Sequence, residues 1–218
     1  ENRTDTALLP ISCFTADQDP ARYARFHEIR SNVFADELGW QLSKPDGPWL
    51  DPFDRGARLF MAETADREPV GILRALVADT AFPHQEMFAH DLECTGLTGR
   101  TSIIGTLNAL AVLPSHRGRL YRSVSDTMVG TVAHLLLRSA LKDLESRGVQ
   151  AVFATVLGVR SARSFLRVGF RLLGPPQGMP GQERFIVANV GVVLPCGRHR
   201  TSEWVTRARV YFDARHRE

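Results

Sequence analysis

The sequence predicts an α/β fold in which helices flank a mixed sheet, and three observations lead to this expectation. Segments with helical and strand-like periodicity alternate along the chain. The 218 residues are 44% hydrophobic and 23% charged, as is typical of a globular protein. No internal repeat, linker or low-complexity segment divides the chain. We therefore expect a single domain over residues 1–218, with its core at about 10–195.

Eleven elements make up the expected order, and a terminal helix follows them. In chain order they are a strand at 11–16, a helix at 20–38, hairpin strands at 58–64 and 70–78, a short helix at 83–92, a strand at 103–113, a helix at 120–147, a strand at 151–157, a helix at 160–168, and strands at 170–173 and 184–194. A basic amphipathic helix is expected at about 201–216, where apolar residues recur at helical spacing.

The N-terminal elements have clear start and stop signals. The Asp19 side chain can cap a helix, and Pro20 suits its first position because the missing N–H has no partner there in any case. Gly39 ends the apolar stripe of this helix. The polar segment 65–69 separates two strand-like runs, which predicts a hairpin.

The C-terminal half has the longest apolar patterns. Residues 103–113 form an apolar run that stops at Pro114, which indicates a buried strand. From Leu120 to Arg147 apolar residues recur along one helical stripe, and Gly148 follows as a stop. Gly169 ends the next, shorter helical pattern in the same way.

Composition excludes several function classes. The net charge of +3 is too small to support nucleic-acid binding by itself. No apolar run reaches the roughly 20 residues that span a bilayer. The three cysteines Cys13, Cys94 and Cys196 lie far apart, which argues against a disulfide framework, and with the histidines they show no metal-ligand spacing. We expect a reducing, cytoplasmic location and no bound metal.

Two basic segments point to a phosphorylated ligand. Residues 110–119 run from the end of the long strand through a turn that contains Arg117, Gly118 and Arg119. We expect the helix at 120–147 to follow directly, and its N-terminal N–H groups and dipole favour a phosphate. Arg160, Arg163 and Arg167 share one face of the later short helix, where they either meet an acidic partner or form a solvated face.

These two segments, in this order, resemble the acyl-coenzyme A signature of the GNAT acyltransferase superfamily. The matching stretches are Leu110-Ala-Val-Leu-Pro-Ser-His-Arg-Gly-Arg119 and Ser161-Ala-Arg-Ser-Phe-Leu-Arg-Val-Gly-Phe170. The resemblance implies the GNAT fold, with a mostly antiparallel mixed sheet flanked by helices. It also implies a phosphopantetheine thioester, on acyl carrier protein or coenzyme A, as co-substrate, with no tightly bound cofactor.

The N-terminal half resembles one branch of this superfamily, the acyl-homoserine-lactone (autoinducer) synthases, and also the long-chain N-acyl amino acid synthases. The resemblance rests on residues that match in type, order and spacing. They are Arg30, Phe34, Trp40, Asp51, Asp54 and Arg74. It covers most of residues 23–194 and implies transfer of an acyl chain to an amine.

The chain also departs from these families at informative positions. Thr106 and Ala109 stand where autoinducer synthases carry a Glu and an Arg on the long strand. Leu120 and Arg122 replace later glycines of the coenzyme A turn, and Phe165 replaces the Tyr that protonates the leaving thiolate. The first departure disfavours lactone synthesis, and the last two favour a carrier-bound donor with an apolar acyl chain.

Direct attack of an amine on a thioester needs a proton acceptor, a polarised carbonyl and room for the acyl chain. Asp51, Asp54 and Glu63 are the candidate carboxylates; alternatively, Asp51 only starts a turn and Asp54 pairs with Arg74. Backbone N–H groups of Leu110, Ala111, Val112 and Leu113 are the expected polarisers. The candidate substrate-binding residues are Arg30, Phe34, Trp40, Arg74 and Phe165, where Arg30 either anchors a substrate carboxylate or forms an internal salt bridge.

The sequence therefore predicts an N-acyltransferase that moves a fatty acyl chain to the amino group of an amino acid, an amino-acid derivative or a peptide. Acyl carrier protein is a possible partner, and neither nucleic acid nor a membrane span is expected. Two alternatives stay open: an autoinducer synthase, and an inactive module that binds an acyl group or its carrier.

Overall fold

The computed structural model describes residues 6–40, 51–77, 88–95, 104–125, 127–179 and 182–194. It groups the chain into two compact units. One unit holds residues 1–74 and 109–140, and the other holds residues 75–108 and 141–218. The terminal helix expected at about 201–216 and most of the helix expected at 83–92 lie outside the described residues.

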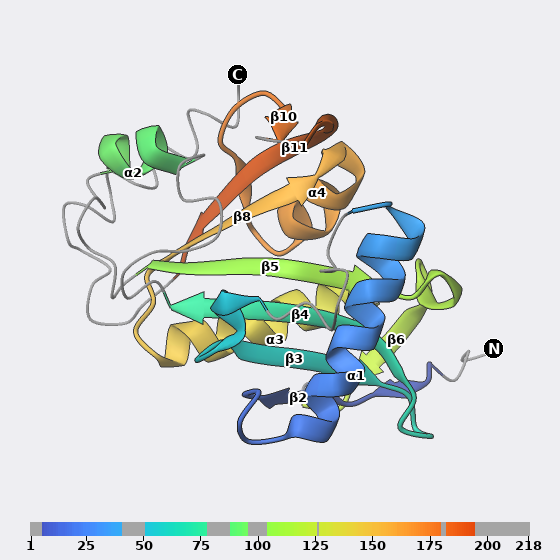
Figure 1. The fold of residues 1–218 in the computed structure, drawn as a ribbon. Coiled ribbons are helices and arrows are strands. Elements are labelled where there is room, and N and C mark those ends of the chain that lie inside the picture. The colour runs from blue at the N-terminus through green and yellow to red at the C-terminus, as the bar shows by residue number, and fades with distance from the viewer. Residues whose placement is uncertain are drawn as a thin grey trace, which may run out of the picture. The chain divides into compact units, whose positions relative to one another are not determined.

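The first unit contains two sheets and the N-terminal helix (Figure 1). Strands β2 (Ile11–Phe14), β3 (Arg58–Glu63), β4 (Pro69–Val77) and β5 (Ile104–Val112) are neighbours in that order in the larger sheet. A smaller sheet has the order β1 (Leu8–Leu9), β6 (Leu120–Ser123) and β7 (Val129–Thr131). Pairing is antiparallel between β2 and β3 and between β6 and β7, and parallel between β1 and β6.

Helix α1 (Pro20–Arg30) begins as its sequence predicts. The Asp19 carboxylate accepts a hydrogen bond from the Arg22 N–H at 3.0 Å, and Pro20 takes the first turn. The helix continues as a π-helix, η1 (Ser31–Glu37), and the chain then turns at Gly39 with φ of 67°. In Figure 1 α1 passes in front of β3 and β4.

The second unit contains the C-terminal end of β4, the N-terminal part of β5 and the later strands. The strand order there is β4, β5, β8 (Ala151–Leu157), β11 (Gln182–Val193) and β10 (Gln177–Met179), and β9 (Arg171–Leu172) also pairs with β11. Only the pairing of β5 with β8 is parallel among the pairs recorded here. Helix α4 (Gly158–Arg167) packs on β8 and β11, and α2 spans Ala89–Thr95. The sheet of each unit is thus mixed, mostly antiparallel and flanked by helices, as predicted.

The helix expected at 120–147 is wrong in its first half. Residues 120–123 form β6, in which Leu120 and Arg122 are exposed while Tyr121 and Ser123 are buried. This alternation is that of a strand. Serine, glycine and β-branched residues between Ser123 and Thr131 also disfavour a helix. Helix α3 instead spans Val132–Ser146, and Gly148 follows it with φ of 83°.

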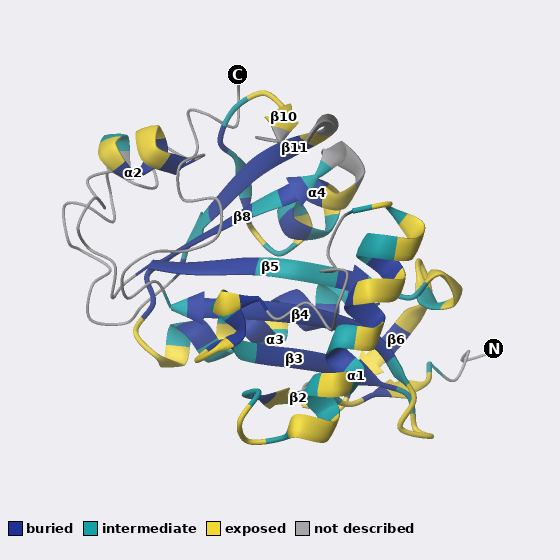
Figure 2. Ribbon diagram, viewed as in Figure 1, coloured by how far each residue is buried: buried dark blue, intermediate teal, exposed yellow. Residues whose placement is uncertain are grey.

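The core consists of apolar residues on the sheet and the adjoining helix faces. Figure 2 colours the ribbon dark blue where residues are buried. In the first unit Gly71 of β4 allows close approach of α3, because a Cβ there would lie 2.6 Å from Val132 Cγ1. None of the described helices is long and apolar enough to cross a membrane.

Candidate active site

Four charged side chains meet in the first unit. Arg30 ends α1, Asp51 caps the 3₁₀ helix η2 (Pro52–Asp54), Asp54 ends that helix, and Arg74 lies on β4. All four are nearly inaccessible, with 5%, 8%, 2% and 3% of their surface exposed. We call them the arginine–aspartate cluster.

Two guanidinium groups bridge the two carboxylates of the cluster. Arg30 donates to Asp51 Oδ2 at 2.8 Å and lies 3.3 Å from Asp54 Oδ2. Arg74 Nη1 donates to Asp54 Oδ1 at 2.6 Å and also to Asp51. The Phe53 N–H supplies a further donor to Asp51 at 2.9 Å. Two negative and two positive charges therefore balance in a site from which water is largely excluded.

The surroundings keep both carboxylates ionised. Burial alone would favour the neutral acid, but the contact with His27 and the charges of Arg74 and Arg30 lower the pKa of Asp54 to about 2. Burial acts in the same way on Asp51, yet Arg74 and Arg30 lower the pKa of that carboxyl too. A carboxylate with so low a pKa holds a proton poorly at neutral pH, so these groups are suited to anchor charge.

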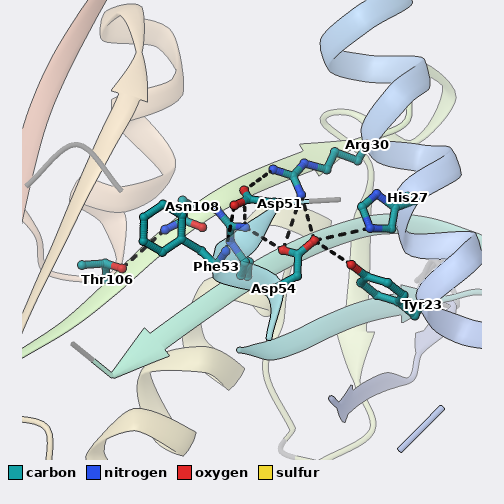
Figure 3. Close-up of polar contacts among 9 residues, drawn as sticks. Tyr23, His27, Arg30, Asp51, Phe53, Asp54, Thr106 and Asn108 are labelled. Atoms are coloured by element: carbon teal, nitrogen blue, oxygen red, sulfur yellow. Dashed lines mark hydrogen bonds and ion pairs between the residues drawn. The ribbon is translucent and has the colours of Figure 1, made fainter. Parts of the chain in front are cut away.

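Two residues that the sequence analysis missed complete the surroundings of Asp54. Figure 3 shows Tyr23 and His27 projecting from α1 toward this carboxylate, beside Arg30. The Tyr23 hydroxyl donates to Asp54 Oδ2 at 2.9 Å, and His27 Nε2 lies 3.3 Å from the same oxygen. The spacing of residues 23, 27 and 30 places them on one helix face, a signal that the sequence already contained.

Glu63 takes part in a different set of ion pairs. This residue of β3 is buried, and its carboxylate lies 3.5 Å from Arg22 and 3.8 Å from Arg25 of α1. Both distances are those of loose ion pairs, which hold α1 against β3. A role of Glu63 in proton transfer stays a prediction.

The two predicted aromatic wall residues lie together. The ring centroids of Phe34 and Trp40 are 5.0 Å apart. Phe34 lies in the π-helix, and Trp40 follows the turn after it. π-helical segments occur often at functional sites because they place side chains off the normal helical positions. Phe165 belongs to the second unit, where it is buried and packs edge-to-face on Phe170 at 5.2 Å.

Strand β5 carries the expected carbonyl-polarising segment. Residues Ile104–Thr106 of this strand pair with β8. Further along, Ala109 has φ of 53°, which interrupts the extended backbone. A non-glycine residue in this conformation stores strain and is common at functional sites. Leu110, Ala111 and Val112 follow on the strand, whereas the Leu113 N–H already donates to Val70 O at 3.0 Å. The Leu113 N–H is thus engaged by β4, and a role of Leu113 at the acyl-donor site stays a prediction.

The turn after β5 differs from its expected setting. It leads into strand β6 rather than a helix, so the predicted contribution of a helix dipole beside Arg117 and Arg119 is wrong. Arg119 is exposed and Gly118 has φ of 76°. Arg117 donates through Nε to Val112 O at 2.8 Å, and through its two terminal nitrogens to Glu37 of the π-helix at 2.5 and 2.6 Å. This bidentate pair lowers the pKa of Glu37.

Within the described residues no group of three or more His, Cys, Asp or Glu side chains is arranged to hold a metal ion. Cys94 does have a histidine neighbour, because one turn of α2 places its Sγ 3.5 Å from His90 Nε2.

Comparison with known proteins gives a consistent picture. No protein-family profile matches the chain. An acyl-homoserine-lactone synthase from Acinetobacter nosocomialis is 27% identical over 179 residues, which cover 80% of this chain and 95% of that protein. The chain thus resembles the synthases that the sequence analysis named.

Solved structures show the same fold. The coenzyme A-dependent acyl-homoserine lactone synthase BjaI, described with SAM and isopentyl-CoA, matches 94% of this chain at 18% identity with a TM-score of 0.62. The synthase LasI matches 86% at 15% identity, also with a TM-score of 0.62. An N-acetyltransferase structure from Lactobacillus plantarum matches 86% at 16% identity with a TM-score of 0.54. The predicted GNAT fold is confirmed, and the predicted acyltransferase class agrees with the similarity to the Acinetobacter synthase.

Proposed function

We propose that this protein is an N-acyltransferase of the autoinducer-synthase type, which moves an acyl chain from a phosphopantetheine thioester to the amine of S-adenosylmethionine and closes a homoserine lactone. The observation that carries this proposal is the arginine–aspartate cluster. Each of its four members is a residue through which the sequence resembles acyl-homoserine-lactone synthases. The similarity to the Acinetobacter synthase over 80% of the chain supports it.

The reaction consists of two bond exchanges. The neutral amine attacks the thioester carbon, the carbon–sulfur bond breaks, and the thiol leaves with the proton that the amine loses. The acceptor's carboxylate oxygen then attacks the carbon next to the sulfonium, and methylthioadenosine departs as the lactone closes. No redox partner is needed in either step.

The residues of this chain supply binding and orientation. Asp51 and Asp54 hold the two guanidinium groups in place and set the local charge, which orients an acceptor bearing both an amine and a carboxylate. Their low pKa values argue that the amine's proton passes to water or to the leaving thiolate instead. Backbone N–H groups beside the strained Ala109 polarise the thioester carbonyl.

A second acceptor class has a specific observation in its favour. Thr106 and Ala109 lie on β5 where autoinducer synthases carry a Glu and an Arg. A chain without those two charges fits an acceptor that lacks the sulfonium, such as a free amino acid, and the product is then an N-acyl amino acid.

One product assay separates these possibilities. The purified protein is given octanoyl-coenzyme A or octanoyl carrier protein together with S-adenosylmethionine, or with a mixture of amino acids, and the products are identified by mass spectrometry. We expect octanoyl-homoserine lactone and methylthioadenosine in equal amounts. Octanoyl amino acids alone would establish the second acceptor class, and consumption of neither acceptor would indicate the inactive, acyl-binding alternative.

A further inference from the structure

One face of α1 is devoted to a single carboxylate. Tyr23, His27 and Arg30 follow one another at intervals of four and three residues, so their side chains emerge from the same side of the helix. All three reach Asp54, at 2.9, 3.3 and 3.3 Å from its Oδ2 atom. The first two are absent from the residues through which the chain resembles known synthases.

The two oxygens of Asp54 differ in their partners. Oδ2 meets the three side chains of α1, while Oδ1 accepts the short hydrogen bond from Arg74 at 2.6 Å and a longer one from Arg30 at 3.5 Å. Asp54 is only 2% exposed, so water does not readily take the place of a side chain that is removed. The orientation of this carboxylate, and with it the placement of Arg74, therefore depends on Tyr23 and His27.

We propose that Tyr23 and His27 are positioning residues of the acceptor site, which fix the carboxylate of Asp54 and, through it, the guanidinium groups of Arg30 and Arg74. The identification of the bound molecule as an acyl acceptor rests on the proposed function. The contacts of Tyr23 and His27 with Asp54 are independent of that function.

The charges of the arginine–aspartate cluster balance. Two carboxylates and two guanidinium groups cancel, and Tyr23 is neutral because burial and the charge of Asp54 raise the pKa of its hydroxyl. Tyr23 and His27 therefore act on Asp54 through the placement of its carboxylate.

Three variants test this role. Tyr23→Phe removes only the hydroxyl donor, and His27→Leu removes the imidazole. His27→Gln keeps a side-chain N–H of similar reach. The matched control is His134→Gln, because His134 is a half-buried histidine of α3.

We expect Tyr23→Phe and His27→Leu to raise the KM for the acceptor about tenfold, as a misplaced binding group does, while the KM for the acyl donor changes less than about twofold. His27→Gln restores acceptor binding to within about threefold of the parent protein. Equal changes in both KM values, or a Gln variant no better than Leu, would overturn the proposal.

A measurement without turnover separates this inference from the proposed function. Denaturant unfolding of Tyr23→Phe, Asp54→Asn and the double variant gives the coupling between the two side chains. A double variant that is clearly less destabilised than the sum of the single variants supports the positioning contact even if no acceptor is consumed. Additive effects would overturn it whatever the enzyme does.

Discussion

Replacing Asp54 by Asn tests the electrostatics of the arginine–aspartate cluster directly. Asparagine keeps the shape of the side chain but removes the charge that balances Arg30 and Arg74. The pKa of Asp54 falls from 3.8 to about 2 on folding, and each unit corresponds to about 1.36 kcal/mol, so the ionised carboxylate contributes roughly 2 to 3 kcal/mol to the free energy of unfolding at pH 7.

The sign of this effect defines the assay. Because the folded pKa lies below the unfolded value, the stabilisation is complete above about pH 5 and is lost as the pH falls toward 2, with about half gone by pH 3. Urea unfolding of the parent and of Asp54→Asn between pH 7 and pH 3 measures the difference in free energy. We expect the difference to shrink by more than 1 kcal/mol over this range. A difference that is independent of pH would refute the reasoning.

Three further predictions address the donor, the acyl chain and the fold. Changing Arg117 and Arg119 to Ala should raise the KM for the acyl donor, and in the parent protein that KM should depend strongly on salt; an unchanged donor KM would remove this turn from the site. Four extra methylenes contribute roughly 3 kcal/mol, so hexanoyl donors should outcompete acetyl-coenzyme A by about a hundredfold, and Phe165→Tyr should not raise turnover with them, whereas a preference for acetyl would contradict an apolar chain path. Gly71→Ala should lower the free energy of unfolding by about 1 to 3 kcal/mol, because its Cβ would lie 2.6 Å from Val132 Cγ1 and 3.2 Å from Ala111 O; a neutral result would contradict the close packing of α3 on β4.

Local signals in the sequence predicted most elements of the fold. Asp19 and Pro20 fixed the start of α1, and the run of apolar residues 151–157 corresponds to β8 with the same bounds. The prediction failed between Leu120 and Thr131, where apolar residues matched a helical stripe by chance. Tertiary pairing decided that segment, since the Arg122 N–H donates to Ala7 O and the Ser123 N–H to Met128 O.

Part of the site was also predictable from the sequence, because some of its residues belong to a recognisable pattern. Family resemblance pointed to Arg30, Asp51, Asp54 and Arg74, and the structure brings these four together. Resemblance could not point to Tyr23 or His27, whose importance follows only from the approach of η2 to α1. Nor could it show that Glu37, far away in sequence, engages Arg117.

The rate of thiol release from octanoyl-coenzyme A or octanoyl carrier protein, with and without the amine acceptor, tests the central claim most directly. The account predicts release that requires the acceptor and that falls roughly a hundredfold in kcat/KM in Asp51→Asn, since a displaced cluster misplaces the acceptor, while a melting curve shows that the variant is still folded. Thiol release that proceeds equally without an acceptor, or is unchanged in a folded Asp51→Asn protein, would contradict an acyltransferase whose acceptor site is the arginine–aspartate cluster.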